Sequence, residues 1–125
     1  MSERTTRILF GALAAYHLAL GLLMVVAPKV FFEQIGPFGV RNDHYIRDVA
    51  TFYLAFGAGL ALAVRRPSWR VPMVAVVALQ YVFHVVNHLV DVSKADPGWL
   101  GPADAIALAL GAVLLLWVWR AEERR

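Results

Sequence analysis

The chain has 125 residues and a formal net charge of +3, and 60% of its residues are hydrophobic while only 17% are charged. The length indicates one domain, and a soluble domain of this size needs more polar residues to cover its surface. The composition therefore indicates an integral membrane protein and argues against a soluble enzyme, a disordered tail and a nucleic-acid binder, while the absence of cysteine excludes disulfides and thiol chemistry.

Four apolar stretches follow one another along the chain, at residues 8–27, 44–64, 71–92 and 102–119. A helix needs about 20 residues to cross the hydrocarbon core of a bilayer, and none of the stretches alternates as a barrel strand does. The first stretch resembles a signal peptide, but no cleavage site of small residues follows it, so we expect an uncleaved helix. The sequence predicts an all-α, four-helix transmembrane bundle in a single domain, residues 1–125.

The connections between the stretches add two expectations. Residues 28–43 place Phe31, Phe32 and Phe38 among polar residues and glycines. We expect either a partly helical, interfacial lid on the outer face or a loop that dips its aromatic rings into the headgroups. Residues 65–70 read Arg-Arg-Pro-Ser-Trp-Arg and form a tight turn, which predicts that the second and third helices are antiparallel neighbours. Small residues recur at intervals of four in two stretches and favour close packing: Ala55, Gly59, Ala63 and Ala103, Ala107, Gly111.

The basic residues predict the orientation. In a four-span protein the termini and the 65–70 turn share one side, and that side holds eight of the lysines and arginines against four on the other. Because positive charge favours the cytoplasmic side, we expect both termini in the cytoplasm. Glu122, Glu123 and the final arginines are expected to form a solvated tail.

Polar residues inside the apolar stretches are the candidate functional residues, because they are costly in a membrane. The third stretch carries Gln80, His84, Asn87, His88 and Asp91 on one helical face. The start of the second carries His44, Asp48 and Thr51, the first contains His17, and the fourth contains Asp104 near its outer end.

The tight turn predicts the relative depths of these residues. If the two helices run antiparallel from the turn, Asp48 lies level with Asn87 and His88, and His44 lies level with Asp91. The polar residues then form a pocket that opens to the outer face and ends near mid-membrane at His84 and His17.

Three kinds of chemistry suit such a pocket. Two histidines at i, i+4 with a carboxylate and a third imidazole could hold a divalent metal ion, with His44, Asp48, His84 and His88 as ligands. An enzyme acting on a lipid-soluble substrate would use His84 or His88 as a base oriented by Asp48. In a purely structural or accessory subunit, the same side chains would only hydrogen-bond helix to helix.

The segments from Phe38 to Asp48 and from His84 to Asp91, and the Ala27–Pro28 pair after the first stretch, resemble small four-span bacterial membrane proteins, and the overall hydropathy is similar to the DoxX-like group. This resemblance implies a four-helix bundle in the bacterial inner membrane. It implies no reaction and no site residue.

Taken together, we expect a multi-pass inner-membrane protein whose polar pocket binds a metal or a small molecule. Its expected partners are the lipid bilayer and a small-molecule or lipid ligand, with no nucleic acid. A divalent metal ion is the one cofactor considered, and the sequence does not fix the oligomeric state.

Overall fold

The computed structural model describes all residues from 1 to 125 and is built from helices alone, without a strand. The four long helices are α1 (Glu3–Val26), α3 (Asp43–Arg65), α4 (Arg70–Val90) and α5 (Leu100–Glu123). The short elements are α2 (Pro28–Gln34) and the single-turn 3-10 helices η1 (Pro67–Trp69) and η2 (Val92–Lys94). The predicted all-α class is therefore confirmed.

Four helical segments are long and apolar enough to cross a membrane: Glu3–Val26, Asp43–Arg65, Pro67–Val90 and Leu100–Glu123. They overlap the four stretches predicted from the sequence. Only 22–33% of each apolar window is buried inside the molecule, so most of these apolar side chains face outward. That distribution is expected of helices surrounded by lipid, and the chain has the helices of a multi-pass membrane protein.

The helix boundaries follow from local side-chain chemistry. The Ser2 hydroxyl accepts a hydrogen bond from the backbone N–H of Thr5 at 3.1 Å and caps the start of α1. The Asn42 side chain accepts from the backbone N–H groups of His44 and Tyr45 and caps α3. Pro28 occupies the first position of α2, where its missing N–H costs nothing.

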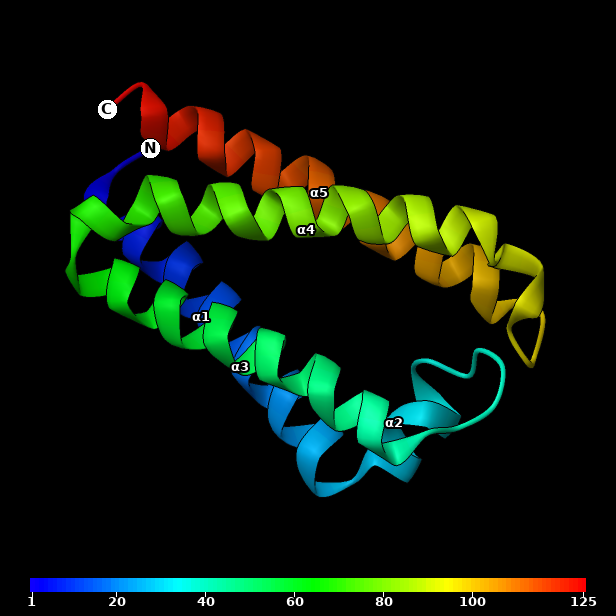
Figure 1. Ribbon diagram of the computed structural model, residues 1–125. Coiled ribbons are helices and arrows are strands. Elements are labelled where there is room, and N and C mark those ends of the chain that lie inside the picture. The colour runs from blue at the N-terminus through cyan, green and yellow to red at the C-terminus, as the bar shows by residue number, and fades with distance from the viewer.

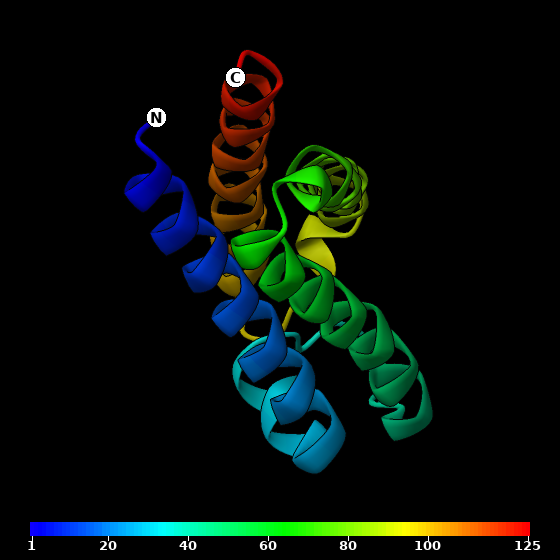
Figure 2. The same ribbon diagram turned by 90° about the vertical axis from the view of Figure 1, so that its left-hand side faces the viewer.

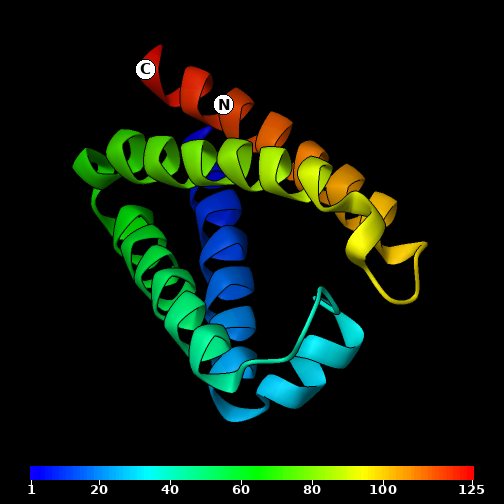
Figure 3. The same ribbon diagram turned by 45° about the vertical axis from the view of Figure 1, so that its right-hand side comes forward.

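The long helices form two pairs, α1 with α3 and α4 with α5 (Figure 1). The pairs meet at the end of the molecule that holds both chain termini and η1, which we call the termini end. They diverge toward the opposite end, which carries α2 and η2 and which we call the loop end (Figure 3). Seen from the termini end, α1 and α3 run side by side, apart from α5 (Figure 2).

This arrangement corrects one prediction. The tight turn at η1 predicted that α3 and α4 are neighbours along their length, but the two helices approach each other far less than the helices within each pair do. The physical reason is that a tight turn fixes the two helix ends that it joins and leaves their crossing angle free. Packing within the pairs decides that angle instead.

Glycines allow the helices within a pair to approach closely. A Cβ added at Gly57 of α3 would lie 2.6 Å from Cγ of Leu18 on α1, and 2.9 Å from its backbone nitrogen. In the other pair, a Cβ added at Gly111 would lie 2.8 Å from the ring of Tyr81. Gly111 belongs to one of the two predicted sets of small residues at intervals of four, whereas Gly57 does not.

The main core contains side chains from all four long helices. Its fully buried large residues are Phe10, Leu60, Val74, Val77, Leu115 and Val118. The smaller cluster of Met24, Ala50 and Tyr53 belongs to the α1–α3 pair alone. The two pairs therefore share a core only where they meet.

Two loops link the pairs across the loop end. Phe38, which follows α2, forms an isolated antiparallel bridge with Ala95, which precedes α5. The backbone N–H of Asp96 donates a hydrogen bond to the carbonyl oxygen of Pro37 at 3.1 Å. The space between the diverging pairs is therefore bounded by backbone contacts at its far end.

Candidate functional site

A cavity of about 440 Å³ lies between the two helix pairs at the loop end. Its lining comes from α1, α2, α3, α4, α5 and the segment 35–42. Most of the lining residues are hydrophobic, and the polar ones lie mainly on α4 and α5. Because small-molecule sites usually measure about 300–1,000 Å³, the cavity is large enough for a small organic ligand.

The apolar side of the cavity comes from α1, α2 and α3. Leu20 and Met24 of α1 face it one helical turn apart, because they are four residues apart in the sequence. Phe31 and Phe32 of α2 and Val49 of α3 extend the same surface. A ligand with an apolar body would find its contact area on this side.

The polar side comes from α4 and α5. His84, Asn87 and His88 line it from α4, Asp91 lines it directly after the end of α4, and Asp104 lines it from α5. The α4 positions repeat at intervals of three and four residues, which places them on one face of the helix. Four of the five polar residues singled out in the third apolar stretch therefore lie at this cavity.

His84 and His88 contact each other directly. Their Nε2 atoms are 3.2 Å apart, and the rings meet edge to face with centroids 4.7 Å apart. A hydrogen bond between two ring nitrogens requires one N–H and one bare nitrogen, so in neutral rings one Nδ1 carries a proton and the other does not. Both Nδ1 atoms are buried without a partner, so the pair keeps one unused donor and one unused acceptor.

Of the two carboxylates that line the cavity, Asp104 is the one without a partner. It forms no ion pair, and its Oδ2 atom is buried without a hydrogen-bond partner. It lines the cavity from α5, as His88 does from α4. Asp91, by contrast, pairs with Lys94 at 2.8 Å.

Aromatic rings complete the site. The ring of Phe38 meets that of His88 edge to face, with centroids 4.8 Å apart. Tyr16, Tyr53 and Tyr81 line the cavity from three different helices. Tyr53 and Tyr81 carry no signal in the sequence, because aromatic residues are common in apolar helices and nothing local distinguishes those that face a cavity.

Asp48 and His44 do not reach the cavity, which corrects the register prediction. They form an ion pair with each other, with His44 Nε2 3.4 Å from Asp48 Oδ2, and their side chains are 79% and 58% exposed. Asp48 forms no hydrogen bond with Asn87 or His88. The face of α3 that meets the cavity carries Ile46, Val49 and Tyr53 instead.

Three other predicted pocket residues also lie elsewhere. His17 is fully buried, and its Nδ1–H donates to the carbonyl oxygen of Leu13 at 2.7 Å while its ring stacks on Tyr53. The Thr51 hydroxyl donates to the backbone carbonyl of Asp48 at 2.6 Å and is exposed. Gln80 lies in a shallow groove on α4 that His84 and Asn87 also border.

The structure does not assemble the predicted set of metal ligands. His84 and His88 lie together on α4, but His44 and Asp48 belong to the other helix pair and point away from the cavity. No group of three histidine, aspartate or glutamate side chains has a geometry that could hold a metal ion. The reason is that α3 diverges from α4. Residues expected at the same depth on the two helices, such as Asp48 and His88, therefore do not meet.

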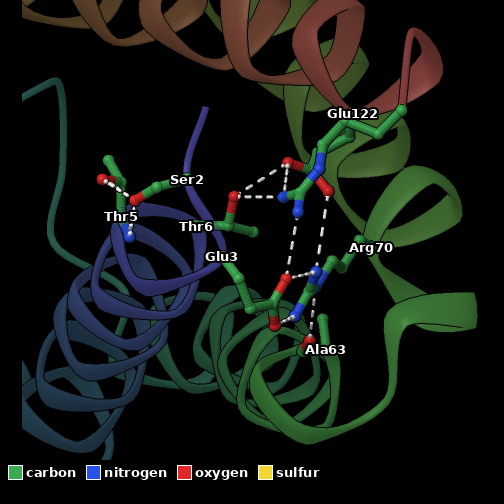
Figure 4. A network of polar contacts seen from close by, with 8 residues as sticks. Ser2, Glu3, Thr5, Thr6, Ala63, Arg70 and Glu122 are labelled. Carbon is green, nitrogen blue, oxygen red and sulfur yellow. Dashed lines mark hydrogen bonds and ion pairs between the residues drawn. The ribbon is translucent and has the colours of Figure 1, made fainter.

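A second polar cluster lies at the termini end, where Arg70 is nearly buried with a side chain 5% exposed (Figure 4). Its guanidinium donates two hydrogen bonds to the Glu3 carboxylate, at 2.9 and 2.6 Å. Its Nε–H donates to the carbonyl oxygen of Ala63 at 3.2 Å. Arg70 therefore ties α4 to both α1 and α3.

Glu122 joins α5 to the same cluster. It accepts a hydrogen bond from the Thr6 hydroxyl at 3.1 Å and lies 4.0 Å from Arg70. Arg125 donates to Thr6, to Glu122 and to Glu3. The expectation of a solvated tail is therefore wrong for Glu122, whose side chain is 4% exposed.

We call Glu3, Thr6, Arg70, Glu122 and Arg125 the termini cluster. Its members come from segments far apart in the sequence. The sequence was used to compare the number of basic residues on the two sides of the membrane, and that comparison does not show which charges lie close together. The signal that could have revealed the cluster is that acidic and basic residues gather at the same ends of three predicted spans. Because every charge in it has a partner, the cluster is suited to holding the helices together and leaves no group free for a ligand.

Comparisons with family models, with curated proteins and with solved structures give no match to this chain. The functional argument therefore depends on the geometry of the cavity.

Proposed function

We propose that this protein is a multi-pass membrane protein that binds a small, membrane-soluble, amphipathic molecule in the cavity at its loop end. The observation that carries the proposal is the combination of an apolar wall with buried polar atoms that have no partner: Nδ1 of His84, Nδ1 of His88 and Oδ2 of Asp104. An unpartnered polar group away from water costs about 1–3 kcal/mol. A ligand whose polar end faces α4 and α5 would satisfy these atoms.

The proposal includes an orientation and a location. Both termini and the η1 turn would face the cytoplasm, because their side carries eight of the twelve basic residues. The cavity would then open near the outer face of a bacterial inner membrane, the location that the resemblance to the DoxX-like group implies. Segment 28–43 would lie at the outer interface. Reporter fusions at the C-terminus and near residue 97 test this orientation.

A structural role without a ligand is less well supported. Side chains that serve only to join helices are expected to hydrogen-bond across them. That is what the termini cluster does. The polar side chains at the cavity bond to no other helix, so they add little to the cohesion of the bundle.

A catalytic use of the same cavity has one observation in its favour. His88 and the carboxylate of Asp104 line the same cavity, and imidazole and carboxylate groups serve together as acid–base groups in enzymes. In this second candidate function Asp104 takes the orienting role that the sequence assigned to Asp48. Chemical change of the bound molecule on incubation with the purified protein would distinguish an enzyme from a binding protein.

The binding proposal is tested by filling the cavity. Ala107 of α5 lines it, so Ala107→Trp places an indole where the ligand would lie. The matched control is Ala61→Trp, because Ala61 of α3 is exposed and does not line the cavity. Native mass spectrometry of protein released from its host membrane should show a bound small molecule in the wild type and in Ala61→Trp, and none in Ala107→Trp. Equal occupancy of all three proteins would contradict the proposal.

A further inference from the structure

We infer that the molecule bound in the cavity is an organic cation and that Asp104 is its counter-ion. This inference rests on the proposed function, because it specifies the chemical class of the ligand at the same site. It depends on three properties of the cavity: the sign of its charge, the missing partner of one carboxylate, and the aromatic rings in its lining.

The charged residues that line the cavity are both acidic. They are Asp91 and Asp104, and no lysine or arginine is among the lining residues. An anionic ligand would meet two carboxylates and no fixed positive charge. The cavity is therefore complementary to a positive charge.

The two carboxylates differ in their partners. Asp91 is paired with Lys94 at 2.8 Å, whereas Asp104 forms no ion pair and its Oδ2 atom is buried without a hydrogen bond. A carboxylate oxygen that is buried without a hydrogen bond is unfavourable unless a cation or a proton compensates it. A ligand cation next to Asp104 supplies that compensation.

Aromatic rings line the cavity that Asp104 also lines. Phe38 lies edge to face on His88. Tyr16 and Tyr81 line the same cavity. Aromatic faces attract organic cations, and aromatic-lined sites are the usual means of binding quaternary ammonium groups.

A metal cation does not fit this position equally well. No three histidine, aspartate or glutamate side chains are arranged so that they could hold a metal ion. Most of the lining is hydrophobic and offers contact area to carbon substituents and no ligands to a metal ion. The cation that fits is one whose charge is carried by a nitrogen with apolar substituents.

The test uses two probes of the same shape, benzyltrimethylammonium and neopentylbenzene, in which carbon replaces the charged nitrogen. Their affinities for the intact protein in lipid nanodiscs are measured by isothermal titration, and empty nanodiscs supply the correction for partition into lipid. We expect the cation to bind at least roughly tenfold more tightly than its neutral isostere. Asp104→Asn should remove most of that preference and leave binding of neopentylbenzene unchanged.

Asp91→Asn is the matched control. It removes a carboxylate from the same cavity, but this carboxylate already has a lysine partner. This variant should keep the preference for the cation. A comparable loss in both variants would mean that the cavity attracts cations by its general charge, and it would overturn the assignment to Asp104.

Other outcomes separate the inference from the proposed function. If the two probes bind wild-type protein equally, His88 compensates Asp104 and the inference fails, while a binding cavity remains. If neither probe binds, the inference also fails, and the Ala107→Trp experiment alone decides the proposed function. If Asp104→Asn does not fold, the comparison of the two probes on wild-type protein still gives the answer.

Discussion

The two ends of the molecule treat polar side chains in opposite ways. At the termini end, Arg70 and Glu122 are buried, and each has partners on other helices. At the loop end, His84, His88 and Asp104 line a cavity and keep polar atoms without partners. The comparison teaches that polar residues at membrane depth do not by themselves mark a functional site. The two ends differ in whether these side chains have a partner on another helix, and those in the cavity without a partner are available to a ligand.

The packing of the helices explains why the two ends differ. All four long helices contribute to the core at the termini end, so the charges there lie within reach of one another. Toward the loop end the pairs diverge, and α4 lies apart from α3 (Figure 1). The cavity is a consequence of this divergence.

The largest expected effect is at the termini end. Arg70→Ala removes the shared partner of Glu3 and Glu122 and leaves buried Glu122 without that cation. We expect the free energy of unfolding to fall by about 3 kcal/mol, because the hydrogen bonds from Arg70 to Glu3 and Ala63 are lost, and a hydrogen bond to a charged group contributes about 1.5–3 kcal/mol. Arg125 remains as the partner of Glu3 and Glu122. The measurement is denaturant or thermal unfolding in detergent micelles.

Arg66→Ala is the matched control for that variant, because Arg66 lies four residues earlier, is exposed and forms no ion pair. Its stability should equal that of the wild type. If both variants lose the same stability, the termini cluster does not hold the helices together.

Packing within a pair should have the next largest effect. Gly57→Ala adds a methyl group that would lie 2.6 Å from Leu18, so α1 and α3 must move apart. We expect a loss of about 1–3 kcal/mol, the usual cost of overpacking. Gly11→Ala is the control, because nothing lies within 4 Å of the added Cβ, and it should be as stable as the wild type or more stable.

At the loop end the sign of the effect should reverse. Asp104→Leu removes a carboxylate with an unpartnered buried oxygen, so the protein without ligand should gain about 1 kcal/mol of stability. The same variant should lose cation binding. A marked fall in its melting temperature would mean that Asp104 serves the fold, as the residues of the termini cluster do.

The smallest effect should come from Asp48→Ala. Asp48 pairs with His44 in an exposed position at the start of α3, and exposed ion pairs contribute little. We therefore expect no measurable change in melting temperature or in ligand binding. If Asp48→Ala lost as much ligand binding as Asp104→Asn, Asp48 would belong to the binding site, which would contradict the observed arrangement.

The spans and their helical class were predictable because hydropathy is a local property of the chain. The face of α4 that carries His84 and His88 was predictable for the same reason, since helical periodicity fixes which residues share a face. The partners of that face were not predictable. They depend on the crossing angle of α3 and α4, which follows from how the helices pack within each pair. Glycines such as Gly57 help to set that packing, and their effect appears only when a second helix is present.

The termini cluster illustrates the same limit. Glu3, Arg70 and Glu122 are visible in the sequence as charges near the ends of apolar stretches, where solvent is the usual partner. Only the assembled bundle brings them within hydrogen-bonding distance. The position of Asp104 near the outer end of its stretch made it a candidate for the polar pocket. Its lack of a partner, which makes it informative, is a property of the folded molecule.

The central claim is that the loop end holds an accessible cavity, and cysteine labelling tests it most directly because the chain has no cysteine of its own. A single cysteine is introduced at Ala107, which lines the cavity, or at Ala112, which is 6% exposed in the core of the same helix. The protein in lipid nanodiscs is treated with a small water-soluble cationic methanethiosulfonate. The account predicts rapid labelling at 107, slowed by benzyltrimethylammonium, and no labelling at 112. Equal resistance at both positions would mean that the loop end is closed and that its polar residues serve only to join helices.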